Sequence, residues 1–161
     1  MAKTAVINAS PLIFLSCGGK LDLLHHFADR ILVPKPVIQE IQAKGSGDIT
    51  VMAVEGTPWL EPVAIPTIPE IISAWGLGPG ESSVLAIAVA NPGMEAIIDD
   101  LTGRRCAALL GIPVRGTLGI VLAAKQRGHI AAARPIMEEL VKAGLYLSSA
   151  VLDKALKRVG E

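Results

Sequence analysis

Four carboxylates and one amide lie where apolar segments of this chain begin or end: Asn8, Glu40, Glu81, Asp99 and Asp100. They are far apart in sequence, but each is next to a segment that would be buried, so folding can bring them together. Oxygen ligands without a nearby histidine are the set that Mg²⁺ or Mn²⁺ prefers over zinc. The pattern predicts a site for Mg²⁺ or Mn²⁺, of the kind that hydrolyses phosphodiester bonds.

Acids that share one crevice repel each other. Several carboxylates packed together destabilise a fold unless a divalent cation offsets the repulsion. The alternative is that each acid is a solvated charge at a helix end, because Asp and Glu favour helix N-termini on electrostatic grounds alone. For Glu81 by itself the two interpretations are equally strong, but four acids at the ends of elements favour the cation.

Asn8 is an amide at the position where the set should begin with an acid. Its carbonyl oxygen can still bind Mg²⁺, but it carries no negative charge and cannot act as a base. We therefore expect the affinity of the site for metal to be weakened.

Short apolar runs alternate with helical patterns along the chain. Strands are expected at residues 4–8, 31–33, 59–65, 96–98 and 112–114. Pro62 places the third of them at an edge, because proline cannot donate to a ladder. Alternation of strand and helix predicts an α/β fold, with a mainly parallel sheet. Ligands of such sheets collect outside the carboxyl ends of the strands, where Asn8 and Asp99 would lie.

Two of the acids belong to expected helices. A helix over residues 36–41 carries Glu40 away from its apolar stripe. The glycine-rich run at residues 76–80 leads into a second helix, with Glu81 in its first turn. No P-loop lysine follows this run, so it is interpreted as an entry loop and not as a phosphate cradle.

Three smaller expectations concern other apolar stretches. Cys17 and Cys106 lie in apolar surroundings without the spacing of a zinc site, which indicates buried structural thiols. Residues 145–147 are expected to pair briefly as a strand. Ser148 or Ser149 can cap a last helix.

Composition limits the class of protein. The 161 residues fit one domain, spanning 1–161, and 51 % hydrophobic content with a mean hydropathy of +0.50 supplies a full core. Fifteen basic and fifteen acidic residues cancel, so nucleic acid would have to bind a local patch. Aromatic residues make up 3 %, too few for a platform of stacked bases. We expect a cytoplasmic protein without a membrane span, because no apolar run is long enough.

Basic residues of the second half of the chain could contact phosphates. They are Arg104, Arg105, Arg115, Lys125 and Arg127. Helix surfaces usually carry such residues, and that interpretation is the stronger one for each alone. Arg104 and Arg105, close behind the acidic pair, are the candidates for contact with nucleic acid.

Longer stretches of the sequence resemble a PIN domain. The resemblance rests on the run at 6–13, the residues around Glu40, the Gly80-Glu81 pair that opens an apolar helix, and the acidic pair at 99–100 followed by two arginines. Residues 110–114 and 116–120 further resemble a prokaryotic PIN-like subfamily related to the ribonuclease toxins of toxin–antitoxin pairs. The match covers nearly the whole chain.

The resemblance implies a Rossmann-like α/β/α sandwich and a nuclease site that binds Mg²⁺ or Mn²⁺. The first acid of the family falls on Asn8, the second on Glu40, the third on Glu81, and the last on Asp99 or Asp100. Ser10 would be the hydroxyl that supports the first acid. Thr117 lies where further pocket residues of the family occur, but no acid follows it.

Three functions are compatible with these observations. The first is an endoribonuclease that cleaves RNA, a possible toxin–antitoxin component, weakened by Asn8. The second is a catalytically silent nucleic-acid-binding or regulatory protein. In the third, the chain acts mainly as one half of a complex, with an antitoxin-like protein or a second copy of itself, and the resemblance favours a homodimer.

Overall fold

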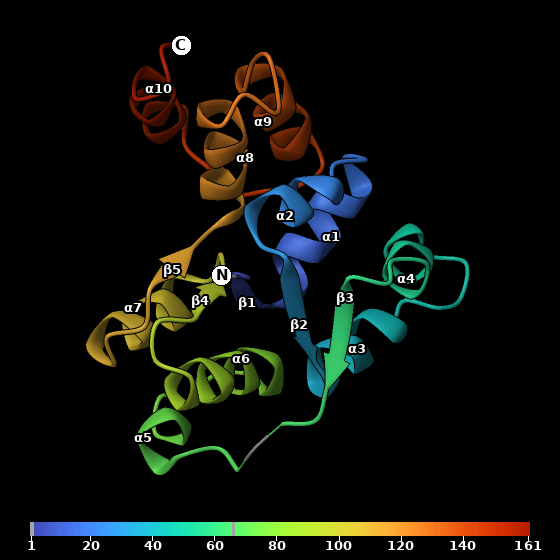
Figure 1. Ribbon diagram of the computed structural model, residues 1–161, viewed down its shortest axis with the longest axis vertical. Helices are drawn as coiled ribbons and strands as arrows, with labels where there is room; N and C mark the ends of the chain where they lie inside the picture. Colours follow the sequence, from blue (N-terminus) through green and yellow to red (C-terminus); the bar gives the residue numbers. More distant parts are fainter. Residues whose placement is uncertain (1, 66) are drawn as a thin grey trace.

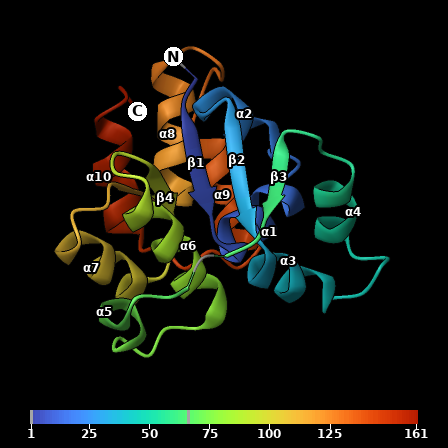
Figure 2. The ribbon, with the colours of Figure 1, turned by 60° about the horizontal axis from the view of Figure 1, so that its bottom comes forward.

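A five-stranded, wholly parallel sheet forms the centre of the protein within residues 2–65 and 67–161, the part of the chain that the computed structural model describes. The strands are β1 (Thr4–Ile7), β2 (Arg30–Pro34), β3 (Leu60–Val63), β4 (Glu95–Ile97) and β5 (Val114–Arg115). Their order across the sheet is β3-β2-β1-β4-β5. Figure 2 shows β1, β2 and β3 side by side and pointing the same way.

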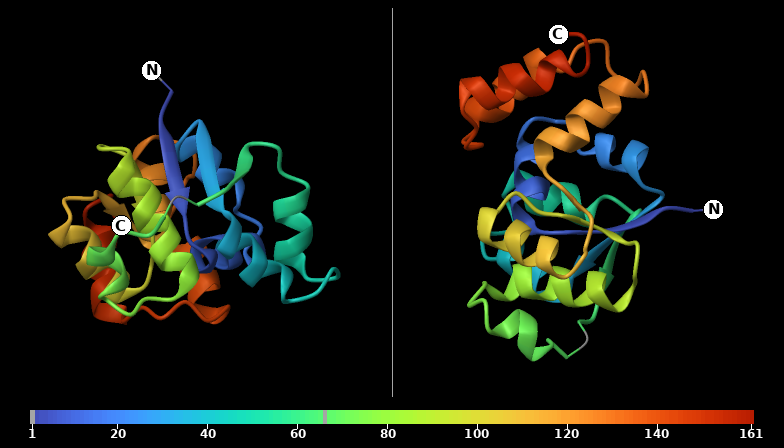
Figure 3. Two further views of the ribbon diagram at one scale, coloured as in Figure 1. Left: turned by 90° about the horizontal axis from the view of Figure 1, so that it is seen from below. Right: turned by 90° about the vertical axis from the view of Figure 1, so that its left-hand side faces the viewer.

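Helices cover both faces of the sheet. They are α1 (Ala9–Cys17), α2 (Asp22–Phe27), α3 (Lys35–Gln42), α4 (Ile49–Glu55), α5 (Glu70–Ser73), α6 (Pro79–Ala90), α7 (Leu101–Leu109), α8 (Thr117–Gln126), α9 (Arg134–Lys142) and α10 (Ser149–Lys157). Helices α6 and α7 lie on one side, and α1, α2 and α8 lie on the other (Figures 1 and 3). Helices α9 and α10 stack outside α8, farther from the sheet.

The strand order reverses beside β1. In the register of the sheet, Val6 pairs with Leu32 of β2 on one side and with Ala96 of β4 on the other. The chain moves outward through β2 and β3 and then returns to β4, next to its starting strand. This reversal opens a crevice at the carboxyl ends of β1 and β4, the usual ligand position in such sheets.

The strands are apolar because both of their faces are buried. Val6, Ile7, Ile31 and Ile97 are fully inaccessible to solvent. Parallel strands covered on both sides appear in a sequence as continuous apolar runs and not as alternating patterns. The predicted α/β fold with a parallel, helix-covered sheet is therefore confirmed.

Two smaller predictions are wrong. Cys17 is exposed at the end of α1, although Cys106 is buried as expected. Burial raises the pKa of the Cys106 thiol above its ordinary value. Residues 145–147 belong to no strand. The Leu145 N–H instead closes the end of α9 by donating to the Leu140 carbonyl at 3.0 Å.

Capping side chains set several helix boundaries. Helix α7 begins directly after Asp100, because the Asp100 carboxylate caps it. Ser148 caps α10, its hydroxyl accepting from the Val151 N–H at 3.2 Å. In the part of the chain that the structure describes, no helix combines the length and apolar character needed to cross a membrane.

Candidate metal and nucleic-acid site

Asn8 follows β1 directly and occupies the position before the first turn of α1. Asparagine at such a position usually accepts a hydrogen bond from a backbone N–H of that turn, but the Asn8 side chain does not cap α1. Only 4 % of Asn8 is exposed. Among the described residues, its Oδ1 atom finds no hydrogen-bond donor. A buried acceptor without a partner costs about 1–3 kcal/mol, so this carbonyl needs an explanation.

The Asn8 carbonyl oxygen lies close to Gly80. This glycine lies in the first turn of α6, and a Cβ atom placed on it would be 3.1 Å from Asn8 Oδ1 and 3.4 Å from Glu40 Oε2. The amide of β1 and the carboxylate of α3 therefore converge beside the start of α6. Because glycine has no side chain, no methyl group crowds these two oxygens at this position.

Asp99 follows β4 at the same edge of the sheet, and Thr117 fixes both of its oxygens. The Thr117 N–H donates to Oδ1 at 2.7 Å, and the Thr117 hydroxyl donates to Oδ2 at 2.6 Å. Thr117 opens α8 and is completely buried. A rigid neighbouring strand and helix thus hold the Asp99 carboxylate in one orientation.

Two of the other acids have helix-capping roles. Asp100 is exposed, and its Oδ2 accepts from the Gly103 N–H at 2.7 Å at the start of α7. Glu81 is partly buried, and its Oε2 accepts from the Gly78 N–H at 3.0 Å at the start of α6. Their roles as metal ligands stay predictions.

The remaining predicted site residues lie around this edge. Ser10 is partly buried in the first turn of α1, two residues after Asn8. Arg104 reaches back from α7 and donates to the Ile98 carbonyl at 3.3 Å, and it lines a cavity together with Asp99. Arg105, its neighbour in α7, is exposed.

The chemistry of the donors fits a hard cation. Asn8, Glu40, Glu81 and Asp99 offer only oxygen atoms, the donors that Mg²⁺ and Mn²⁺ prefer. Within residues 2–65 and 67–161, however, no three His, Cys, Asp or Glu side chains gather closely enough to hold a metal ion. A cation at this edge would therefore depend on the Asn8 amide oxygen as well as on carboxylates.

A family model described as a PIN domain matches residues 4–161, nearly the whole chain. The chain belongs to the PIN domain family. The resemblance noted in the sequence is thereby confirmed. PIN domains are typically nucleases and commonly use divalent metal ions. Among curated proteins, none matches the chain.

Sequence reasoning did not single out two features of this PIN domain. The sequence pattern places Gly80 at the start of a helix, but does not show that it lies beside both Asn8 and Glu40. Lys154 and Arg158 line the same cavity as Arg104. Their spacing of four residues places them on one face of α10, and this spacing was the available signal.

Proposed function

We propose that this PIN domain is a Mg²⁺- or Mn²⁺-dependent ribonuclease whose ligands are Asn8, Glu40 and Asp99, with Glu81 beside them. The observation that carries the proposal is the buried Asn8 Oδ1, which has no hydrogen-bond donor among the described residues and lies, like the Glu40 carboxylate, beside Gly80. A cation would give this oxygen the partner that the protein does not provide.

A bound cation would orient a phosphodiester, lower the pKa of attacking water and offset charge in the transition state. The residues of the chain prepare for this role. Thr117 fixes the orientation of Asp99, and Gly80 places no side chain beside Asn8 and Glu40. Asn8 contributes an oxygen without a charge, so the affinity for metal and the rate should be lower than with an aspartate at this position.

The proposal is tested by cleavage of a fluorescent single-stranded RNA in the presence of Mn²⁺. Three proteins are compared: wild type, Asn8→Asp and Asp99→Ala. We expect slow cleavage by the wild type, faster cleavage by Asn8→Asp because it restores a negative ligand, and none by Asp99→Ala. A dissociation constant for Mn²⁺, measured by the shift in melting temperature, gives a second readout that does not depend on turnover.

The two adjacent aspartates provide a matched control. Asp100→Ala removes the same chemical group one position away, and we expect it to retain cleavage. If Asp99→Ala cleaves as fast as the wild type and Asp100→Ala does not, Asp100 is the catalytic acid. If both variants cleave as fast as the wild type, a contaminating nuclease is responsible. If none of the variants cleaves, the protein is not a ribonuclease.

A specific observation also favours a second candidate, a catalytically silent nucleic-acid-binding or regulatory PIN domain. Position 8 is an amide, and the described residues contain no cluster of three acids at metal-binding distance. RNA binding that survives in EDTA, without cleavage by any variant, would support this candidate. An antitoxin-like protein or a second copy of the chain remains a proposed partner for either function.

A further inference from the structure

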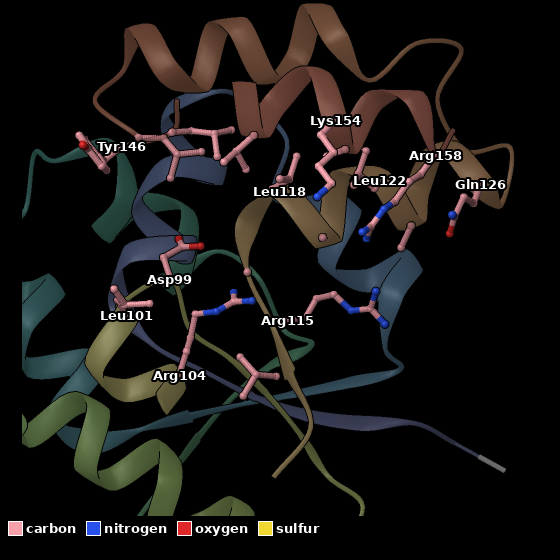
Figure 4. A pocket seen from close by; sticks show the side chains of 18 residues that line it. Asp99, Leu101, Arg104, Arg115, Leu118, Leu122, Gln126, Tyr146, Lys154 and Arg158 are labelled. Carbon is pink, nitrogen blue, oxygen red and sulfur yellow. The ribbon is translucent and has the colours of Figure 1, made fainter. Parts of the chain in front are cut away.

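A cavity of about 770 Å³ opens from Asp99 and extends under α10. Its walls come from α7, β5, α8 and α10, together with the extended segment before α10. Figure 4 shows Arg104 reaching into it from one side and Lys154 and Arg158 from the other, with Leu118 and Leu122 on either side of Lys154. We refer to this space as the α10 cavity. Asp99 lines it and is also a residue of the candidate metal site.

The charged groups of the α10 cavity are mostly positive. Arg104, Arg115, Lys154 and Arg158 line it with a single carboxylate, Asp99. The charge of Arg115 is partly offset by Glu95, whose Oε2 lies 3.4 Å from the Arg115 Nε. Lys154 and Arg158 form no ion pair with any described residue. On a chain with a formal net charge of zero, this is a local cationic surface.

The remaining lining is largely apolar. Leu118 and Leu122 of α8 form the floor, and Leu147 and Val151 lie toward α10. Tyr146, the one tyrosine of the sequence, stands at one end of the cavity, with Gln126 at the opposite end (Figure 4). The side chain of Tyr146 packs on almost nothing, because 99 % of the residue is exposed. An aromatic ring in this position is available to stack on a ligand.

We propose that the α10 cavity holds nucleotides of single-stranded RNA next to the phosphodiester that lies at the metal site. Lys154 and Arg158 contact backbone phosphates, the leucine floor receives the apolar faces of sugar and base, and Tyr146 stacks on one base. One tyrosine is not the aromatic platform that the composition excludes, but stacking on a single ring already supports binding. The inference rests on the proposed function for its choice of ligand.

An acidic peptide is the main rival occupant, since it could also pair with Lys154 and Arg158. Two observations favour RNA. The cavity begins at Asp99, so its occupant is placed next to a candidate catalytic residue, as the flanking nucleotides of a substrate would be. In addition, the unpacked ring of Tyr146 matches the flat face of a base.

The test measures binding of a short fluorescein-labelled single-stranded RNA by anisotropy, in EDTA, at several salt concentrations. The cavity variant is the double charge reversal Lys154→Glu and Arg158→Glu. The matched control is Lys142→Glu and Lys157→Glu, which changes the net charge equally at exposed positions of α9 and α10 that do not line the cavity. Melting temperatures establish that each variant is folded.

We expect the cavity variant to bind RNA at least tenfold more weakly than the control. Its slope of log affinity against log salt should also fall by about 1.4, because two phosphate contacts are lost and each contributes about 0.7 on a single strand. Tyr146→Ala should weaken binding about tenfold and leave this slope unchanged, since stacking involves no phosphate. Tyr146→Phe, which keeps the ring, should bind like the wild type.

Three results would overturn the inference. The first is equal loss of RNA binding in the control, which would indicate a general effect of charge. The second is displacement of the RNA by poly-glutamate of equal charge as effectively as by unlabelled RNA, which would indicate a peptide site. The third is a change in oligomeric state of the cavity variant with unchanged RNA affinity. Because no metal is present, each result is independent of whether the protein cleaves RNA.

Discussion

Thr117 donates two hydrogen bonds to Asp99, one to each carboxylate oxygen, at 2.7 Å from its N–H and 2.6 Å from its hydroxyl. The two residues come from neighbouring strands: Asp99 follows β4, and Thr117 follows β5 after Gly116. Since each oxygen of a carboxylate has two acceptor positions, Asp99 can accept both bonds and still face a cation with its remaining lone pairs. The pairing therefore orients the acid before any ligand arrives.

Thr117→Val should separate this orienting role from simple packing. Valine has nearly the same shape in the buried site but cannot donate to Asp99 Oδ2. We expect a loss of about 1–2 kcal/mol in the free energy of unfolding, and about tenfold weaker Mn²⁺ binding, the usual scale when a residue that orients a metal ligand is lost. Urea denaturation and Mn²⁺-dependent melting measure the two quantities. Thr117→Ser, which restores the hydroxyl, should recover both; if it recovers neither, the hydroxyl has no orienting role.

Asp100→Ala should affect stability and leave metal binding intact. The Asp100 carboxylate accepts from the Gly103 N–H at 2.7 Å and caps α7, so its loss should destabilise the fold by about 1 kcal/mol. Asp99→Ala should instead affect metal binding: its melting temperature should no longer rise when Mn²⁺ is added. If Asp100→Ala is the variant that loses this response, the assignment of the two adjacent acids is reversed.

The fold could be predicted from the sequence because its signals are local. Continuous apolar runs identify the buried strands, and proline in β3 identifies the edge of the sheet, where the structure has it. The start of α7 and the lack of a strand at residues 145–147 could not be predicted, because each depends on the partner that a single hydrogen-bonding group takes. The Asp100 carboxylate extends α7, and closure of α9 uses the N–H of Leu145.

The site was harder to predict than the fold. The sequence correctly identifies residues at strand ends, since Asn8 and Asp99 flank the point where the strand order reverses. It does not reveal which acids cap helices, because a helix-capping carboxylate and a metal ligand occupy the same kind of position, as Glu81 and Asp100 illustrate. The α10 cavity depends on how α10 packs over α8, which no single segment specifies.

Gly80→Ala should weaken metal binding but leave the free energy of unfolding nearly unchanged. Alanine favours a helix over glycine by about 0.5–1 kcal/mol, so the free energy of unfolding should change by less than about 1 kcal/mol. Its Cβ would lie 3.1 Å from Asn8 Oδ1, which would have to shift slightly, and 3.4 Å from Glu40 Oε2, so a methyl group would stand beside both oxygens.

We therefore expect Gly80→Ala to lose the Mn²⁺-dependent rise in melting temperature. Gly47→Ala is the control, because a Cβ there would meet nothing within 4 Å. Unchanged Mn²⁺ binding by Gly80→Ala would place the cation away from Asn8 and Glu40.

Glu161 should make the stability of the fold depend on pH. Its carboxylate accepts from the N–H of Ala133 at 2.6 Å and from the N–H of Arg134 at 3.1 Å, at the start of α9. These bonds, the one from Ala133 first, hold the pKa of Glu161 below its ordinary value of 4.5. A carboxylate whose pKa is lower in the folded than in the unfolded protein stabilises the fold above the unfolded value, and this contribution disappears as the pH falls through the folded value.

Glu161→Gln keeps an acceptor but removes the charge, so it should melt at a lower temperature than the wild type at neutral pH. The difference should close as the pH falls below 4.5, because the wild type then also carries a neutral side chain. Melting curves of the two proteins over this pH range measure the effect. Glu138→Gln, at an exposed position of α9, should follow the wild type throughout. A gap between wild type and Glu161→Gln that stays constant with pH would mean that the charge of Glu161 does not stabilise α9.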